Sequence, residues 1–557
     1  MNKYQTLGEG DCEPRQVEVI GTGDISKVGS ILLEFLSQDF DEGSIGDYQA
    51  TFVDDYACVV RMLGPTFGKG FQPQVYHFRD APFIKRENGS IPRVLNDGEH
   101  AVLRQYGSFV IPSSKIADGF IAAFFDRVHP TMPVLNRAEF YRTYLETSSS
   151  QPVKLPLLLL QAVILSGSTV WKHPDLNLPP DEVSWRLFVR AKALVEQRFE
   201  QDRLALVIAH LLFSTFTCDS CDDTNQNMWL SLGTAIRLAF GLGMHRDLGN
   251  ANALPEHRRQ WKITWWTLFL HDVLCSFEWG RPRAVNLDDS DVPELVERDL
   301  QPVEPGALSC VEHTEFFLQS IDLCFIISTW LDSLRPGGPA KRRASRNGRP
   351  NREEQTRRCC AELSNWYTNL SPAMRPPHSR RSHYSLWSGM LNMCYHAATL
   401  RFYSRDPDAK GKLHDAAVSI SQICVDLCEQ DLIDSIWVYG IHQLDLAMCQ
   451  HARESRDDDP DVAEQGLQNL RTSLPILERL STRSSTAKQG FIFLKEVAEG
   501  NVMRENLATP MHHHESTWDA DMSRWHLQNM EYPGFEGYDG LSADLWTFHS
   551  FDLSDDT

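Results

Sequence analysis

The chain has 557 residues, enough for one large core or for several domains. Its formal net charge of −21 excludes tight binding to a phosphate backbone unless a separate basic module is present. The 13 cysteines are scattered and no apolar leader precedes them, so we expect reduced thiols in the cytosol or nucleus. The longest apolar run, residues 155–165, is too short to span a bilayer, and we expect no membrane association.

The helical pattern begins about a fifth of the way along the chain. Residues 1–110 predict a mixed, irregular segment, because no period persists in them. Residues 111–334 and 353–500 then repeat apolar residues at helical spacing, with short polar breaks and almost no period-two alternation. This pattern predicts an all-α fold with one helical body in two parts. Between the parts, residues 335–352 are rich in Pro, Gly and Arg and predict a disordered basic loop.

The stretch from residue 228 to 293 has the strongest helical pattern. Its first predicted helix, residues 228–241, has one apolar face, and Gly233 lies in that face. We expect a second helix, residues 256–279, to cross the first at Gly233, so that replacing Gly233 with leucine costs a few kcal/mol by overpacking. Gly241 is expected to end the first helix, because glycine readily adopts the left-handed conformation of a C-cap.

The second predicted helix has two adjacent apolar rows, which indicate burial over most of its circumference. Trp265 and Trp266 lie in neighbouring rows, and Asp272 is the one polar member of the first row. A buried carboxylate without a partner costs several kcal/mol, so we expect Asp272 to be paired and to act as a structural lock rather than a catalytic group. Three arginines are candidate partners: Arg237, Arg246 and Arg281.

Three pieces of this stretch, in order and spacing, resemble the middle homology region of fungal zinc-cluster transcription factors. They are A-I-R-L-A-x-x-x-G-M-H-R-D, then W-W-x-L-F-x-x-D, then G-R-P. The family-motif positions are Gly233, Arg237, Gly241, His245, Arg246, Trp265, Trp266, Asp272, Gly280, Arg281 and Pro282. One departure is that the basic pair Arg258 and Arg259 precedes the tryptophans by more than the family's spacing, and only Lys262 keeps the near position. The early helices look closest to regulators of cutinase and fatty-acid utilisation.

The resemblance implies an all-α regulatory domain in a nuclear transcription regulator. In the family, such a domain restrains an activation segment, forms homodimers or heterodimers with related regulators, or senses a small apolar effector, and the residues do not choose among these roles. A second interpretation keeps the fold but makes the chain a cluster-less partner protein that binds a DNA-bound regulator. Lys341, Arg342 and Arg343 are either a nuclear import signal or a solvated loop.

The DNA-binding zinc cluster of the resembled family uses six closely spaced cysteines. Only Cys12 and Cys58 lie in the first 110 residues, and they are far apart. We therefore expect no zinc cluster and no cofactor in this chain, with DNA contacted indirectly or through a missing N-terminal cluster. Either the gene lost the cluster or the sequence begins downstream of it, and zinc is expected only in the second case.

Residues 501–557 form a distinct tail in which carboxylates and aromatic residues alternate. This composition is typical of disordered activation segments that present aromatic side chains to a coactivator groove. The aromatics nearest the end of the chain, and our candidate contacts, are Trp546, Phe548 and Phe551. A merely solubilising tail is the alternative, and the number of aromatic residues disfavours it.

Other motifs have weaker functional interpretations. Cys218 and Cys221 form a lone C-x-x-C, and His512–His514 is a histidine tract; neither has the second ligand group of a structural metal site, so we predict no metal ligands. The acidic run of Asp288, Asp289 and Asp291 is similar to the magnesium-binding run of terpene cyclases, which are also all-α. Those enzymes need a second metal motif that we do not find, so we predict no catalytic residues.

Overall fold

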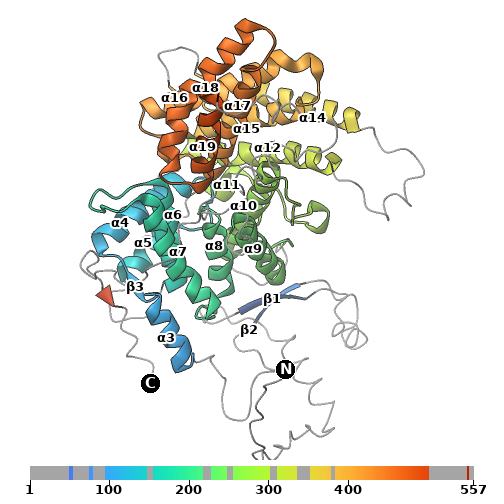
Figure 1. The fold of residues 1–557 in the computed structure, drawn as a ribbon. Helices are drawn as coiled ribbons and strands as arrows, with labels where there is room; N and C mark the ends of the chain where they lie inside the picture. The colour runs from blue at the N-terminus through green and yellow to red at the C-terminus, as the bar shows by residue number, and fades with distance from the viewer. Residues whose placement is uncertain are drawn as a thin grey trace, which may run out of the picture. The chain divides into compact units, whose positions relative to one another are not determined.

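The structure, a computed structural model, describes most of the chain from residue 95 to residue 500. The described residues are 49–53, 74–78, 95–146, 155–216, 227–247, 255–301, 310–334, 352–377, 383–500 and 549–550. The chain separates into two compact units, and every helix described below belongs to the larger one, which includes residues 95–557. The predicted all-α fold is confirmed, because the described residues are mostly helical and their strands are short (Figure 1).

The first part of the helical body runs from α3 to α12. Its helices are α3 (Asp97–Gln105), α4 (Ser114–Ala123), the π-helical turn η2 (Phe124–Val128), α5 (Arg137–Glu146), α6 (Leu157–Val170), α7 (Pro180–Glu196), α8 (Arg203–Phe213), α9 (Met228–Leu242), α10 (Pro255–Trp279), the 3₁₀ turn η3 (Leu287–Asp289), α11 (Glu297–Leu300) and α12 (Val311–Leu334). The described strands are β1 (Gln49–Val53), β2 (Gln74–Phe78), and the antiparallel pair β3 (Val110–Ile111) and β4 (His549–Ser550).

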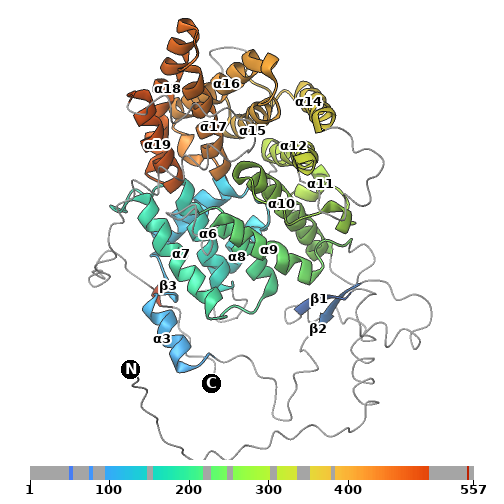
Figure 2. The same ribbon diagram turned by 45° about the vertical axis from the view of Figure 1, so that its right-hand side comes forward.

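The second part is a set of helices that pack on one another in chain order. They are α14 (Arg352–Thr368), α15 (Leu386–Phe402), the 3₁₀ turn η4 (Pro407–Ala409), α16 (Lys410–Glu429), the 3₁₀ turn η5 (Ile433–Ser435), α17 (Val438–Glu454), α18 (Pro460–Ser481) and α19 (Ser485–Ala498). Each of the helices from α15 to α19 contacts the next, as the orange and red ribbons of Figures 1 and 2 show. The two parts are joined through α12 and α17, because α12 packs on α10 and α15 while α17 also reaches α10.

Helix boundaries follow the side-chain signals of the sequence. The Asn227 side chain accepts a hydrogen bond from the backbone N–H of Leu230 and so caps the start of α9. Helix α9 continues past Gly241 and ends at Gly243, whose φ of 85° is the left-handed conformation that glycine favours. Gly280, with a φ of 66°, directly follows the last residue of α10. Glycine therefore sets the turn at the end of α9 and the turn at the end of α10.

Helix α10 is buried on nearly every side, as its two apolar rows predict. Trp265 is 0% exposed, Trp266 is 4% exposed and Asp272 is 2% exposed. Among the described residues, α12 is the one helix that is long and apolar enough to cross a membrane. Its side chains Phe316 and Ile327 are fully buried against the neighbouring helices, and this packing accounts for its apolar composition.

The predicted crossing of two helices at Gly233 is wrong. A Cβ atom built on Gly233 meets no described atom within 4 Å, so α9 has room there for a side chain. Helices α9 and α10 do touch, but through large side chains, with the rings of Phe240 and Trp265 centred 5.4 Å apart. Among the described residues, a close helix approach at a glycine occurs instead at Gly167 of α6. A Cβ there would lie 1.9 Å from the carbonyl oxygen of Phe120 in α4.

Candidate functional site

The end of α9 is fastened to the acidic segment that follows α10. The Arg246 guanidinium lies 2.9 Å from a carboxylate oxygen of Asp291, and the backbone N–H of Asp247 donates to the same carboxylate at 2.7 Å. The Ser290 hydroxyl donates to the carbonyl oxygen of His245 at 2.9 Å. The acidic residues after α10 thus act as partners for the H-R-D end of α9, which is a structural role.

The start of α9 contacts the G-R-P piece that follows α10. The indole N–H of Trp229 donates to the carbonyl oxygen of Pro282 at 3.4 Å, and the Arg281 guanidinium lies 5.5 Å from the centre of the Trp229 ring. Farther along, the indole N–H of Trp266 donates to the carbonyl oxygen of Pro293 at 2.8 Å. The segment after α10 is therefore held against both helices, and the three motif pieces form one connected structure.

Asp272 is paired, as expected for a buried carboxylate, and backbone N–H groups donate hydrogen bonds to it. It accepts from the N–H of Ala284 at 2.9 Å and from the N–H of Val285 at 2.8 Å. Of the predicted arginine partners, Arg246 binds Asp291 and Arg281 stacks on Trp229, as described above, while Arg237 is exposed on α9. Asp272 thus fixes the chain just after the G-R-P piece.

A cavity of about 60 Å³ lies among elements from both parts of the helical body. Its walls come from η2 and the turn after it, the ends of α6 and α8, helix α10, η5, the start of α17 and the turn between α18 and α19. The cavity is partly open to solvent. No motif in the sequence predicts a cavity here. The local feature that marks it in the structure is the π-helical turn at residues 124–128, an element that often occurs at functional sites.

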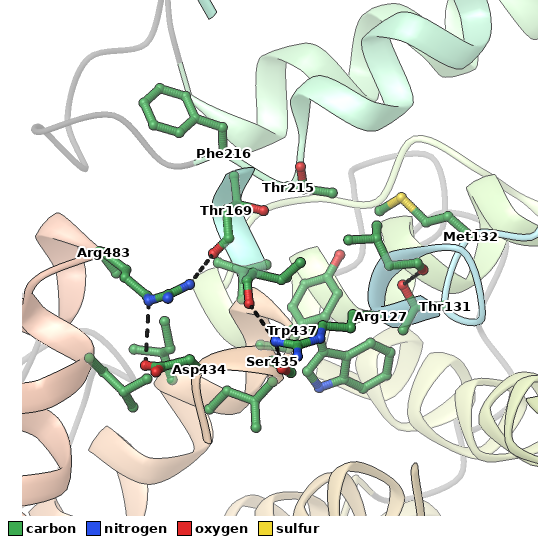
Figure 3. Close-up of a pocket in the computed structure, with 18 of the residues that line it drawn as sticks. Arg127, Thr131, Met132, Thr169, Thr215, Phe216, Asp434, Ser435, Trp437 and Arg483 are labelled. Carbon is green, nitrogen blue, oxygen red and sulfur yellow. Dashed lines mark hydrogen bonds and ion pairs between the residues drawn. The ribbon is translucent and has the colours of Figure 1, made fainter. Parts of the chain in front are cut away.

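Two arginines in the cavity wall connect the two parts of the body (Figure 3). Arg127 of η2 donates to the hydroxyl of Ser435 in η5 at 2.9 Å and to the carbonyl oxygen of Val170 at 3.3 Å. Arg483, between α18 and α19, donates to the carbonyl oxygen of Thr169 at 3.4 Å. Because these bonds join residues some 300 positions apart in the sequence, the cavity exists only when both parts are folded together.

The cavity also touches the motif helix α10 through His271. Burial lowers the pKa of His271 to about 4, so the ring is neutral at physiological pH. Its Nε2 lies 3.1 Å from the carbonyl oxygen of Thr131, which requires the proton on Nε2, and its Nδ1 then accepts from the Tyr439 hydroxyl at 3.0 Å. His271 directly precedes Asp272. This wall of the cavity is therefore adjacent in the sequence to the carboxylate that holds the segment after α10.

The comparisons with known proteins decide the family. A family described as the fungal specific transcription factor domain matches residues 121–368, which include the motif pieces and the N-terminal half of the cavity wall. The chain carries a fungal specific transcription factor domain. No solved structure matches the chain.

The relatives of this fungal transcription factor domain protein are regulators by name. An acetamidase regulatory protein of Aspergillus fumigatus is 29% identical over 73% of this chain and 50% of its own length. The acetamidase regulatory protein of Aspergillus oryzae is 30% identical over 73% of this chain and 50% of its length. Cutinase transcription factor 1 alpha of Fusarium vanettenii is 27% identical over 76% of this chain and 48% of its length. The chain thus spans about half the length of the curated relatives it matches.

These relatives are transcription factors and not enzymes, which decides against the terpene-cyclase alternative. In the structure, Asp288 and Asp289 are exposed in η3, and Asp291 is held by Arg246. Several predicted residues lie outside the described part of the chain. They are Lys341, Arg342, Arg343, Trp546, Phe548 and Phe551, together with Cys218, Cys221 and His512–His514.

Proposed function

We propose that this transcription regulator works through a regulatory helical body and an activation segment in residues 501–557. The observation that carries the proposal is the match of residues 121–368 to the fungal specific transcription factor domain, which supports a regulatory role for the helical body. The acidic and aromatic composition of the tail supports the second half of the proposal. The relatives named as an acetamidase regulatory protein and a cutinase transcription factor support a role in regulating the transcription of enzyme genes.

We further propose that residues 1–557 reach DNA indirectly. The net charge of −21 opposes binding to phosphates, and the first 110 residues do not supply six clustered cysteines. A heterodimer with a related regulator that itself binds DNA would bring the chain to a promoter. This arrangement requires nuclear entry, for which Lys341, Arg342 and Arg343 are the candidate import signal.

The activation role is tested by fusing residues 501–557 to an unrelated DNA-binding domain and measuring a reporter gene. We expect activation, and we expect it to disappear when Trp546, Phe548 and Phe551 are all changed to alanine. Each aromatic ring supplies roughly 1.5 to 3 kcal/mol of burial in a coactivator groove, so loss of three removes most of the affinity.

The matched control changes two nearby carboxylates, Asp544 and Asp552, to asparagine. This variant keeps the aromatic rings, and we expect it only to weaken activation, because the charges mainly speed the encounter. Full activation by the triple alanine variant would show that the tail is a solubilising segment.

A further inference from the structure

The cavity between the two parts of the helical body contains positive charge that is only partly neutralised. Arg483 lies 3.4 Å from a carboxylate oxygen of Asp434, but Arg479 also binds Asp434, at 2.6 Å. Arg479 pairs with Asp431 as well, so two carboxylates serve these two arginines. Arg127 adds a third guanidinium, and no carboxylate of the described residues forms an ion pair with it.

The guanidinium of Arg127 has N–H donors that make no hydrogen bond to the described residues. Both of its hydrogen bonds, to Val170 and to Ser435, are made through Nη1 and go to neutral oxygen atoms. Its Nη2 and Nε atoms have no hydrogen-bond partner among the described residues, and the side chain is only half-buried. A guanidinium with two adjacent free N–H groups matches the two oxygens of a carboxylate, and such charge-assisted pairs are the stronger hydrogen bonds.

The rest of the cavity wall is largely apolar. Val128 and Met132 follow Arg127 on one side, and Phe216 and Trp437 contribute aromatic surface. Trp437 is 8% exposed, and its indole N–H has no acceptor among the described residues. A buried donor without an acceptor costs about 1 to 3 kcal/mol, so this group also favours a ligand that carries an acceptor.

The size of the cavity limits the ligand. Its volume of about 60 Å³ is well below the roughly 150 Å³ of an engineered cavity that holds benzene. An aromatic acid or a long alkyl chain does not fit inside without opening the walls. Because the cavity is partly open to solvent, the charged group of a ligand can remain hydrated while a short alkyl chain enters.

We propose that this cavity binds a small aliphatic carboxylate, with the carboxylate on Arg127 and a short alkyl chain against Met132, Phe216 and Trp437. Such a ligand adds contacts between the two parts of the helical body, since Arg127 belongs to the first part and Trp437 to the second. It therefore stabilises the joined form. If the proposed function holds, the cavity makes the helical body a sensor of this carboxylate. The binding of the carboxylate does not depend on the proposed function.

The test uses the purified 557-residue chain and sodium butyrate, followed by titration calorimetry and by thermal melting at constant ionic strength. We expect saturable binding in the micromolar to millimolar range and a higher melting temperature. Butyramide has the same chain without the charge, and we expect it to bind at least about tenfold more weakly. Octanoate should also bind more weakly than butyrate, because its chain exceeds the cavity.

Two arginine variants locate the site. Arg127→Gln should weaken butyrate binding at least about tenfold, whereas Arg142→Gln, at an exposed arginine of α5, should leave it unchanged. Equal binding of butyrate by the Arg127→Gln variant, equal binding of butyramide and butyrate, or no saturable butyrate binding would each overturn the proposal. If Arg127→Gln does not fold, the comparison of butyrate with butyramide on the unmodified chain still decides. The reporter test of the tail lacks the cavity, so the two proposals fail separately.

Discussion

Changing Gly167 to alanine should lower the melting temperature of the helical body strongly. The new Cβ would lie 1.9 Å from the carbonyl oxygen of Phe120 and 2.7 Å from its carbonyl carbon. These are backbone atoms of α4, so relief requires α4 and α6 to move apart along a buried contact. Overpacking of a core costs about 1 to 3 kcal/mol and occasionally more, and we expect the upper end because no flexible side chain can yield. Thermal or urea unfolding followed by circular dichroism measures the loss.

Gly233→Ala is the matched control, since it is the same substitution on a helix with open space around the glycine. Alanine is a better helix former than glycine by about 0.5 to 1 kcal/mol, so this variant should be neutral or slightly more stable. Equal stability of the Gly167→Ala and Gly233→Ala variants would show that α4 and α6 do not approach as closely as described.

Changing Asp272 to alanine should destabilise the chain by about 3 kcal/mol. The carboxylate is 2% exposed and accepts the backbone N–H groups of Ala284 and Val285. Without it, two inward-facing donors lose their acceptor, at a cost of roughly 1 to 3 kcal/mol each before the chain relaxes. Asp272→Asn keeps one acceptor oxygen and should lose about half as much. Unfolding in urea gives both values.

Asp288→Ala serves as the control for this pair, because Asp288 is an exposed carboxylate of the same segment. Its removal should change the unfolding free energy by less than about 0.5 kcal/mol. An Asp272→Ala variant as stable as Asp288→Ala would mean that Asp272 does not lock the segment after α10.

The elements that the sequence predicts well are those whose signal is local. Helix α10 has two complete apolar rows, so its burial could be predicted without knowledge of its neighbours. The burial of Asp272 followed from the same rows, but its partners did not, because backbone N–H groups look alike in every sequence. Helix α3 was missed although Asn96 and Glu99 form a capping box at its start, which is a readable signal.

Contacts between distant segments could not be predicted in this way. Gly167 and Gly233 both lie on apolar helices, and nothing in the neighbouring residues tells which one meets another backbone. The cavity is a stronger case, because Arg127 and Ser435, which form a hydrogen bond across it, are 308 positions apart in the sequence. Such sites depend on how whole helices pack, and the amino-acid pattern of one segment does not encode them.

The central claim, that this chain regulates transcription through its tail, is tested most directly by RNA levels in cells that express it. Two strains should be compared with the parent: one lacking residues 501–557, and one with Trp546, Phe548 and Phe551 changed to alanine. We predict that a common set of transcripts falls in both strains while the protein level is unchanged. Transcript levels that match the parent in both strains would contradict the claim.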